Sequence, residues 1–222
     1  MKTTIISLFC AFILPVTQAA VLAEYNFSTD LSPTTTGTGV TADDFSTVAN
    51  AGYSGGNENL FLRTDVTGST ESDALSDADY FEFTLSAATP GEVLDLESLV
   101  FDFGGSDSLS NGPYDTTIYV QSSVDGLGSG NPTVGSFTHT VPVGSTGTAG
   151  LTSGTTLDLT GFANQTSITF QFRFADDVND SSMVNRLDNV QLNGTVAIPE
   201  PSTLALTGAA LFAFCVYRRR RG

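Results

Sequence analysis

Residues that could carry out catalysis are few and scattered. His139 is the only histidine, and it follows Phe137 and Thr138 at an expected outward position of a strand. A Ser-His-Asp arrangement needs a nucleophile and an orienting carboxylate beside the imidazole, and no neighbouring pattern supplies them. Zinc hydrolases need several His, Cys or carboxylate ligands at fixed spacing, and this pattern does not occur. We therefore expect a protein that is not an enzyme.

The last residues of the chain carry a more specific signal. Pro199-Glu200-Pro201 is followed by an uncharged, mainly apolar run from Leu204 to Tyr217 and then by Arg218, Arg219, Arg220 and Arg221. A helix from Ser202 to Tyr217 would be at most about 24 Å long, which is shorter than the roughly 30 Å hydrocarbon core of a bilayer. The arginines should stay on the cytoplasmic side and leave the preceding chain outside. A simple C-terminal tail anchor is one interpretation of this pattern.

The order of these three parts resembles the PEP-CTERM sorting signal of Gram-negative bacteria. The resemblance covers Pro199 to Gly222. It implies that a membrane-embedded exosortase cuts near Pro199, Glu200 and Pro201, so the short transmembrane helix anchors the protein only transiently in the inner membrane. The body then passes to the cell envelope, the surface or the extracellular matrix. Prolines suit such a site because they fix φ and hold the segment extended, outside the helix.

The N-terminus has the three regions of a secretory signal peptide. Lys2 supplies the positive charge, Ile5 to Val16 is almost wholly apolar, and Gln18-Ala19-Ala20 supplies small residues. We expect the secretion machinery to export the chain and signal peptidase to cut after Ala19, with Ala20 and Ala23 as alternative sites.

Removal of both ends changes the composition of the protein. The expected domains are a signal peptide at 1–19, a body at 20–198 and the sorting signal at 199–222. The only cysteines, Cys10 and Cys215, lie in the removed segments, so the body has no disulfide. Five of the eight Lys and Arg residues are removed as well, which leaves three arginines against the twenty-four acidic residues from Glu24 to Glu200 and a net charge of −21 for residues 20–200. This charge excludes nucleic acid as a partner, because phosphate binding needs a basic surface.

Alternating apolar residues in the body predict an antiparallel β-sandwich. The clearest strand is expected over 167–175, where Ile168, Phe170, Phe172 and Phe174 face the core and Thr169, Gln171 and Arg173 face outward. We expect Phe81, Phe83 and Phe101 among the partners of these phenylalanines. A slip in the alternation near Ser98 predicts a bulge or a break between two short elements.

The remaining segments are read from the same alternation and from turn residues. Further strands are expected at 21–27, 59–65, 80–85, 94–103, 116–122, 134–143, 157–160 and 183–196, with polar loops at 28–44 and 66–79. No segment of the body has the pattern of an amphipathic helix with convincing caps. The number and spacing of strands favour a jelly-roll-like sandwich over a compact immunoglobulin-like domain.

The final strand resembles the closing strand of many extracellular jelly rolls, including carbohydrate-binding modules. The resemblance is carried by Leu187-Asp188-Asn189-Val190, followed by Leu192-Asn193-Gly194. In some of these modules an aspartate at the position of Asp188 helps to hold a structural calcium ion beside the first strand. Glu24 or Asp30 would supply a second carboxylate if the ends of the domain meet. The alternative is that Asp188 is an ordinary surface residue at the start of a strand.

Three functions remain open at this stage. The favoured one is a non-enzymatic, secreted protein of the cell surface or extracellular matrix, associated with biofilm or exopolysaccharide. The first alternative is a polysaccharide-binding module. Since there is no tryptophan, its candidate sugar-stacking residues are Tyr53, Tyr114 and Tyr119. The second alternative is a glycan hydrolase, which needs two carboxylates across a cleft and has no marked pair here.

Overall fold

The computed structural model describes residues 19–49, 51–54, 59–62, 70–107, 113–178 and 183–198. The expected signal peptide before Ala19 and the expected sorting segment after Ile198 lie outside these residues. No helix within the described ranges is long and apolar enough to cross a membrane.

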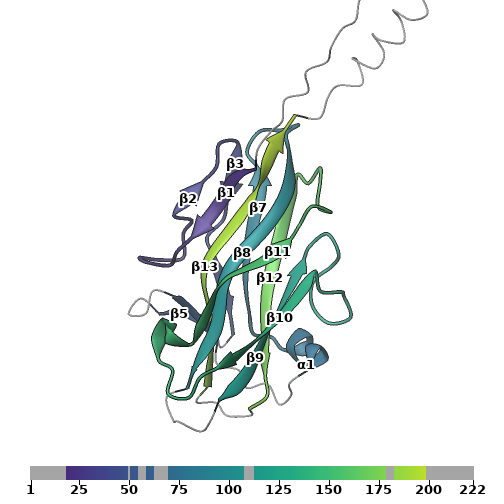
Figure 1. Cartoon of the computed structure of the whole chain (residues 1–222). Helices are drawn as coiled ribbons and strands as arrows, with labels where there is room; N and C mark the ends of the chain where they lie inside the picture. Colours follow the sequence, from purple (N-terminus) through teal and green to yellow (C-terminus); the bar gives the residue numbers. More distant parts are fainter. Residues whose placement is uncertain are drawn as a thin grey trace, which may run out of the picture.

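Two antiparallel sheets pack face to face and form an elongated sandwich (Figure 1). Sheet A has the order β11 (Leu151–Asp158), β8 (Val93–Asp107), β13 (Met183–Ala197), β1 (Ala20–Tyr25) and β2 (Thr35–Thr36). In the same sheet, β6 (Asn59–Leu62) also pairs with β13, and β5 (Ala51–Ser54) pairs with β6. The predicted all-β, antiparallel sandwich is therefore confirmed.

The second layer, sheet B, has the order β10 (Gly135–Val141), β9 (Tyr114–Ser122), β12 (Ser167–Asp176), β7 (Tyr80–Ala87) and β3 (Val40–Ala42). The short strand β4 (Ser46–Val48) also pairs with β7. Besides these strands, the described chain has one short α-helix, α1 (Glu71–Ser76), and one 3-10 turn, η1 (Gly147–Gly150).

Phenylalanine rings fill the space between the two sheets. Within sheet B the ring centroids of Phe83 and Phe170 lie 5.7 Å apart, and those of Phe81 and Phe174 lie 6.1 Å apart. Phe172 of β12 reaches across to Phe101 of sheet A at 5.7 Å, edge to face. All six rings are buried. The predicted core face of β12 and its predicted partners are confirmed.

Sheet A contains irregularities that the sequence pattern partly anticipated. Asn193 pairs with Ser98 while Gly194 pairs with Leu96, so Glu97 is an extra residue on β8. This agrees with the bulge predicted from the slip near Ser98. A second shift on β13 lies at Asn189, whose φ is +48°, a left-handed conformation that asparagine tolerates better than most residues.

Several short elements were not predicted. The expected loop at 28–44 contains β2 and β3, and the expected loop at 66–79 contains α1. The helix begins with a capping box, in which Thr70 Oγ1 accepts a hydrogen bond from Asp73 N while Asp73 Oδ2 accepts one from Thr70 N. Helices and strands this short contain too few residues to display a period, so alternation alone does not reveal them.

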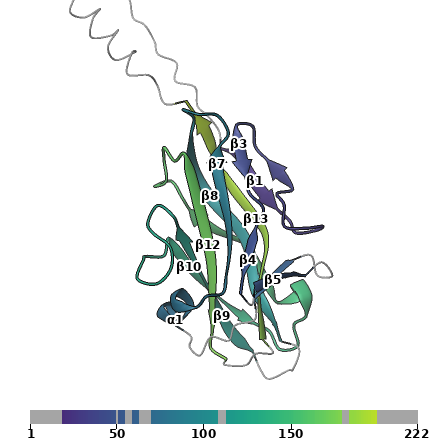
Figure 2. The same ribbon diagram turned by 180° about the vertical axis from the view of Figure 1, so that it is seen from behind.

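The outer face of sheet B is partly covered, which corrects the expectation for Gln171 and Arg173. Both side chains do leave β12 on its outer side, yet they are only 5% and 4% exposed. The helix α1 packs on this face, where Ala74 contacts Tyr119 and Ala175 (Figure 2). The loop after β9 also folds over it, because the Gln121 side chain donates to the carbonyls of Gly128 and Asn131.

The position of Phe172 gives a direct test of the core. Replacing it by alanine removes a ring that touches both sheets, so Phe172→Ala should lower the free energy of unfolding by roughly 3–5 kcal/mol. The matched control is Thr156→Ala on the exposed side of β11, which should change it by about 0.5 kcal/mol or less. Urea unfolding measures both variants. A loss below about 1 kcal/mol for Phe172→Ala would contradict the assigned core.

Candidate functional site

The two ends of the body meet at one end of the sandwich. Strand β1 pairs with the second half of β13, with Ala20 opposite Gly194 and Val21 opposite Asn193. The expected signal-peptide site at Ala19 and Ala20 therefore lies at the start of β1, beside the last residues of β13 (Figure 1). Pro199, Glu200, Pro201 and the four arginines lie outside the described residues, and the described chain ends at Ile198.

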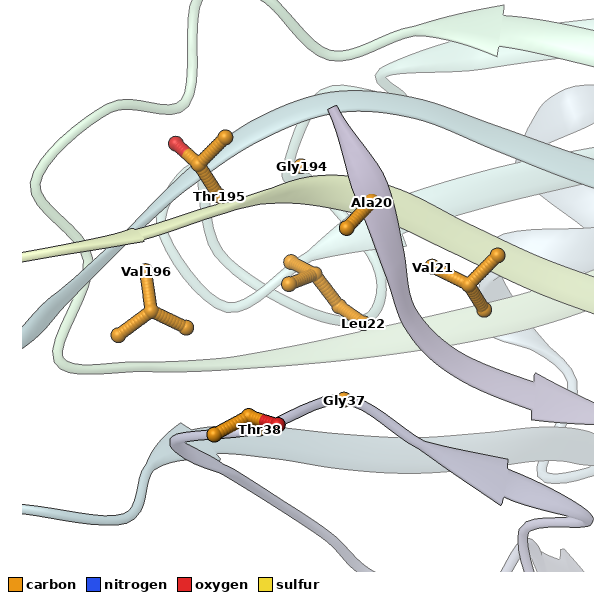
Figure 3. A pocket seen from close by; sticks show the side chains of 8 residues that line it. All are labelled: Ala20, Val21, Leu22, Gly37, Thr38, Gly194, Thr195 and Val196. Carbon is orange, nitrogen blue, oxygen red and sulfur yellow. The ribbon is translucent and has the colours of Figure 1, made fainter. Parts of the chain in front are cut away.

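A shallow groove of about 360 Å³ lies at this same end. Three segments line it: the start of β1, the turn between β2 and β3, and the end of β13 (Figure 3). The lining residues are Ala20, Val21, Leu22, Gly37, Thr38, Gly194, Thr195 and Val196. None of them is titratable or a metal ligand, so the groove offers apolar surface and backbone but no catalytic group.

Two glycines allow the backbones around the groove to approach closely. Gly37 N donates to Leu22 O at 2.8 Å, and a Cβ on Gly37 would lie 2.7 Å from Val21 O. A Cβ on Gly194 would lie 2.4 Å from Asp95 O. A side chain at position 37 would meet the backbone of β1, and one at position 194 would meet the backbone of β8, so both glycines are needed for the junction of the two ends.

His139 takes a different position from the one expected. It lies on the inner side of β10, half-buried, with its ring edge to face with Phe103 at a centroid distance of 6.2 Å. Phe103 belongs to the core. Among the described residues, no nucleophile or carboxylate forms a hydrogen bond with the imidazole. The arrangement is that of a packing histidine at the edge of the core.

The carboxylates expected around calcium are spread along the sheet. Asp188 is buried in β13, opposite Asp102 of β8, and its Oδ1 accepts a hydrogen bond from Asn189 N at 2.8 Å. Glu24 lies opposite Gln191, further along β13. Asp30 is exposed in the following loop, where its Oδ1 accepts from Ser32 N.

The described residues contain no group of three or more His, Cys, Asp or Glu side chains that could hold a metal. Calcium needs six to eight oxygen ligands. A site at Asp188 would therefore depend on backbone carbonyls and water for most of its ligands.

The three candidate sugar-stacking tyrosines all pack against the body. Tyr114 is 1% exposed, and its hydroxyl donates to Val184 O at 3.4 Å. Tyr119 is buried beneath α1, and this burial, together with Glu71 and Asp73, raises the pKa of its phenol. Tyr53 is half-buried and donates to Phe27 O at 3.0 Å. The large hydrophobic side chains exposed in the described chain are aliphatic: Val124, Val143 and Ile198.

A buried polar cluster was not predicted from the sequence. Under α1, the guanidinium of Arg173 lies 4.5 Å from the ring centroid of Tyr80 and donates to Asp77 O and to Gln171 Oε1. Gln171 in turn donates to Glu82 Oε2 at 2.9 Å. Burial lowers the pKa of Arg173. The sequence signal was the single arginine among the outward residues of β12, whose only other charged residue is Asp176 at its end.

Arg186 is the second buried cation. Its Nη1 donates to Asn59 Oδ1 at 2.6 Å and its Nε donates to Ser106 Oγ at 3.2 Å. Arg173 and Arg186 are the only Lys or Arg residues in the described ranges, and both are buried. The surface formed by the described residues therefore presents acidic and neutral groups but no cationic side chain.

Comparison with known proteins identifies the C-terminal segment. A family model described as the PEP-CTERM protein-sorting motif matches residues 197–221, which confirms the sorting signal predicted for this end of the chain. The motif implies export, processing by an exosortase, and a destination at the cell envelope or surface. No curated protein sequence matches the chain.

One similar solved structure is that of a carbohydrate-binding module, TmCBM27, from a study of its specific mannan recognition. The alignment covers 81% of this chain and 99% of that chain, with 10% sequence identity and a TM-score of 0.43. Similarity at this level does not extend to function.

The calcium hypothesis has a test that separates a specific site from general screening. If Asp188 holds a calcium ion in the folded state only, millimolar calcium should raise the melting temperature more than sodium chloride of matched ionic strength. The Asp188→Ala variant should then lose that increment, because a ligand is missing. Magnesium serves as a second control. If calcium and the matched salt raise the melting temperature equally, the effect is general screening of the acidic surface and the calcium site is excluded.

Proposed function

We propose that the protein is a non-enzymatic, secreted β-sandwich of the cell surface or extracellular matrix, installed through its C-terminal sorting motif. The observation that carries this proposal is the position of the motif. Its match begins at Ala197, which is also the last residue of β13. The processing segment therefore follows the folded body directly.

The meeting of both ends supports a membrane-bound intermediate. The signal peptide and the sorting helix would enter the same membrane from one end of the sandwich, since Ala20 lies opposite Gly194. Only residues 199–203 separate the last described residue from the apolar run. Five extended residues span at most about 18 Å. Before cleavage, the body would therefore stand close to the membrane, with the groove-bearing end toward it.

The composition of the described surface supports a structural role rather than catalysis. His139 packs on Phe103, and the groove at the end of the sandwich has no titratable lining. The surface of the described residues is acidic and has no exposed cationic side chain, so it repels other polyanions. An association with exopolysaccharide would then involve neutral chains, or acidic chains only when salt or divalent cations screen the repulsion.

Binding of a neutral polysaccharide is the second candidate, favoured by the hydroxyl groups on the outer face of sheet B. The hydroxyl oxygens of Thr84 and Thr169 lie 2.9 Å apart, and those of Ser86 and Ser167 are also 2.9 Å apart. Such rows can exchange hydrogen bonds with sugar hydroxyls, although the described surface has no exposed aromatic ring for stacking. A pull-down on neutral and on acidic insoluble polysaccharides tests this candidate. For a glycan-binding protein of this charge, we expect retention on the neutral polysaccharide alone. If the protein is retained on neither polysaccharide, this candidate function is excluded.

Processing of the C-terminus is the main test of the proposal. The mature protein should end close to Pro199–Pro201 and lack Cys215 and the terminal arginines, because an exosortase removes the helix. Intact-mass measurement on protein from cells that contain the sorting enzyme gives the result directly. Replacing Pro199 and Pro201 by alanine should leave the tail in place. A wild-type mass that still includes Gly222 would contradict the sorting proposal and indicate a permanent tail anchor.

A further inference from the structure

One flank of the sandwich is built from a long uncharged stretch of sequence, although residues 20–200 have a net charge of −21. No Asp, Glu, Lys or Arg occurs from Gly126 to Leu157. This stretch contains β10, η1 and nearly all of β11. Strand β10 ends sheet B and β11 ends sheet A, and Leu157 of β11 lies against Gly135 of β10. Together they form one flank, here called the neutral flank.

Most strand edges in the described chain are protected in ways that prevent pairing with another molecule. Short length protects β2, β3 and β4, which have two or three residues each. Strand β11 has a register shift between Thr152 and Thr155, with Gly154 at a φ of +69°. Short strands and bulges are the usual means by which proteins avoid edge-to-edge association.

Strand β10 has none of these protections. It runs for seven residues with an unbroken register against β9, from Gly135 opposite Val120 to Val141 opposite Tyr114. No charge and no proline occurs within it, and prolines stand only outside it, at Pro132 and Pro142. On its other side β10 pairs with no strand of the described chain. Its outward residues Ser136, Thr138 and Thr140 are exposed.

We propose that this edge pairs with β10 of a second copy of the protein, antiparallel and about a two-fold axis at Thr138. A two-fold axis at the middle residue allows all seven residues to pair. Thr138 then faces Thr138 of the second copy, and Ser136 faces its Thr140. The same kind of hydroxyl pair already links Thr138 to Thr117 on β9, at 2.9 Å. The joined strands would continue sheet B from one copy into the other by strand addition.

The distribution of charge determines where a second copy can approach. Two such acidic bodies repel each other, and the repulsion is weakest where their neutral flanks face. Acidic side chains border the neutral flank, because Asp102 accepts a hydrogen bond from Gly154 N and Glu71 accepts one from Thr133. Beside β10 itself, Asp115 accepts a hydrogen bond from Thr140 at one end of the strand. In the two-fold arrangement the two Asp115 side chains lie at opposite ends of the joint. Added salt screens the remaining repulsion, so association should strengthen with ionic strength.

Site-specific crosslinking tests this arrangement in the full chain. In a background with Cys10→Ala and Cys215→Ala, the Thr138→Cys variant should form a covalent dimer with a short bis-maleimide, because directly opposed Cβ atoms lie about 5 Å apart. The matched control is Thr41→Cys, an exposed threonine on the short edge strand β3, which should not crosslink. Dimer yield at Thr138 no higher than at Thr41, at low and at high salt, would overturn the proposal.

The register has its own test. A mixture of Ser136→Cys and Thr140→Cys chains should crosslink with each other, while Ser136→Cys alone should not, because its two copies would stand about 14 Å apart along the strands. Thr138→Lys places two like charges face to face and should weaken self-association at least tenfold in sedimentation, whereas Thr41→Lys should not. Crosslinking of Ser136→Cys with itself, or an unchanged Thr138→Lys variant, would exclude this two-fold pairing.

Discussion

Strand β13 is the constraint on which the rest of the structure depends. It pairs with β8 along one edge and with β1 and β6 along the other, and its inward residues Leu187, Val190 and Leu192 belong to the core. Without it, β8 and β1 have no common neighbour, and sheet A divides into two parts. The same strand sets where the body ends, because its last residues stand beside the first residues of β1. The integrity of sheet A and the closeness of the two ends of the body therefore both depend on the backbone hydrogen bonds of β13.

The body achieves a single core without disulfides or tryptophan. Aromatic rings from both layers meet in edge-to-face and tilted pairs, from Tyr25 and Phe45 at 4.7 Å to Phe101 and Phe172 at 5.7 Å. Such pairs add to the burial of apolar area. The two buried arginines have the opposite energetics, since desolvating a cation is costly. Arg173 offsets part of that cost by holding the end of α1 through Asp77, and Arg186 does so by joining Asn59 and Ser106.

Prediction from the sequence succeeded where the physical signal is periodic. The phenylalanines of β7 and β12 and the bulge near Ser98 both follow from alternation. The sorting signal followed from the order of three chemically distinct parts. Elements without a period were missed: β2, β3 and β4 are too short, and α1 has a capping box but only six residues.

The burial of individual side chains was predicted less well, because it depends on contacts between distant segments. Gln171 and Arg173 were expected to face solvent, and they are covered by a helix and a loop that alternation cannot place. The same applies to Tyr119, which lies under Ala74 of that helix. His139 was placed on the wrong side of β10. Whether an aromatic ring is exposed depends on the residues that pack against it in space, and a single sequence does not identify those residues.

The order of strands also has a consequence for how the protein reaches its folded state. Export delivers the chain from its N-terminus, so β1 emerges first and its partner β13 emerges last, after every other strand. Contacts so distant in sequence form slowly. The apolar residues of β1 therefore lack their β13 partners until Ala197 has crossed the membrane. The sandwich therefore closes only when translocation of the body is complete. The junction that brings both ends together therefore forms only on a fully exported body.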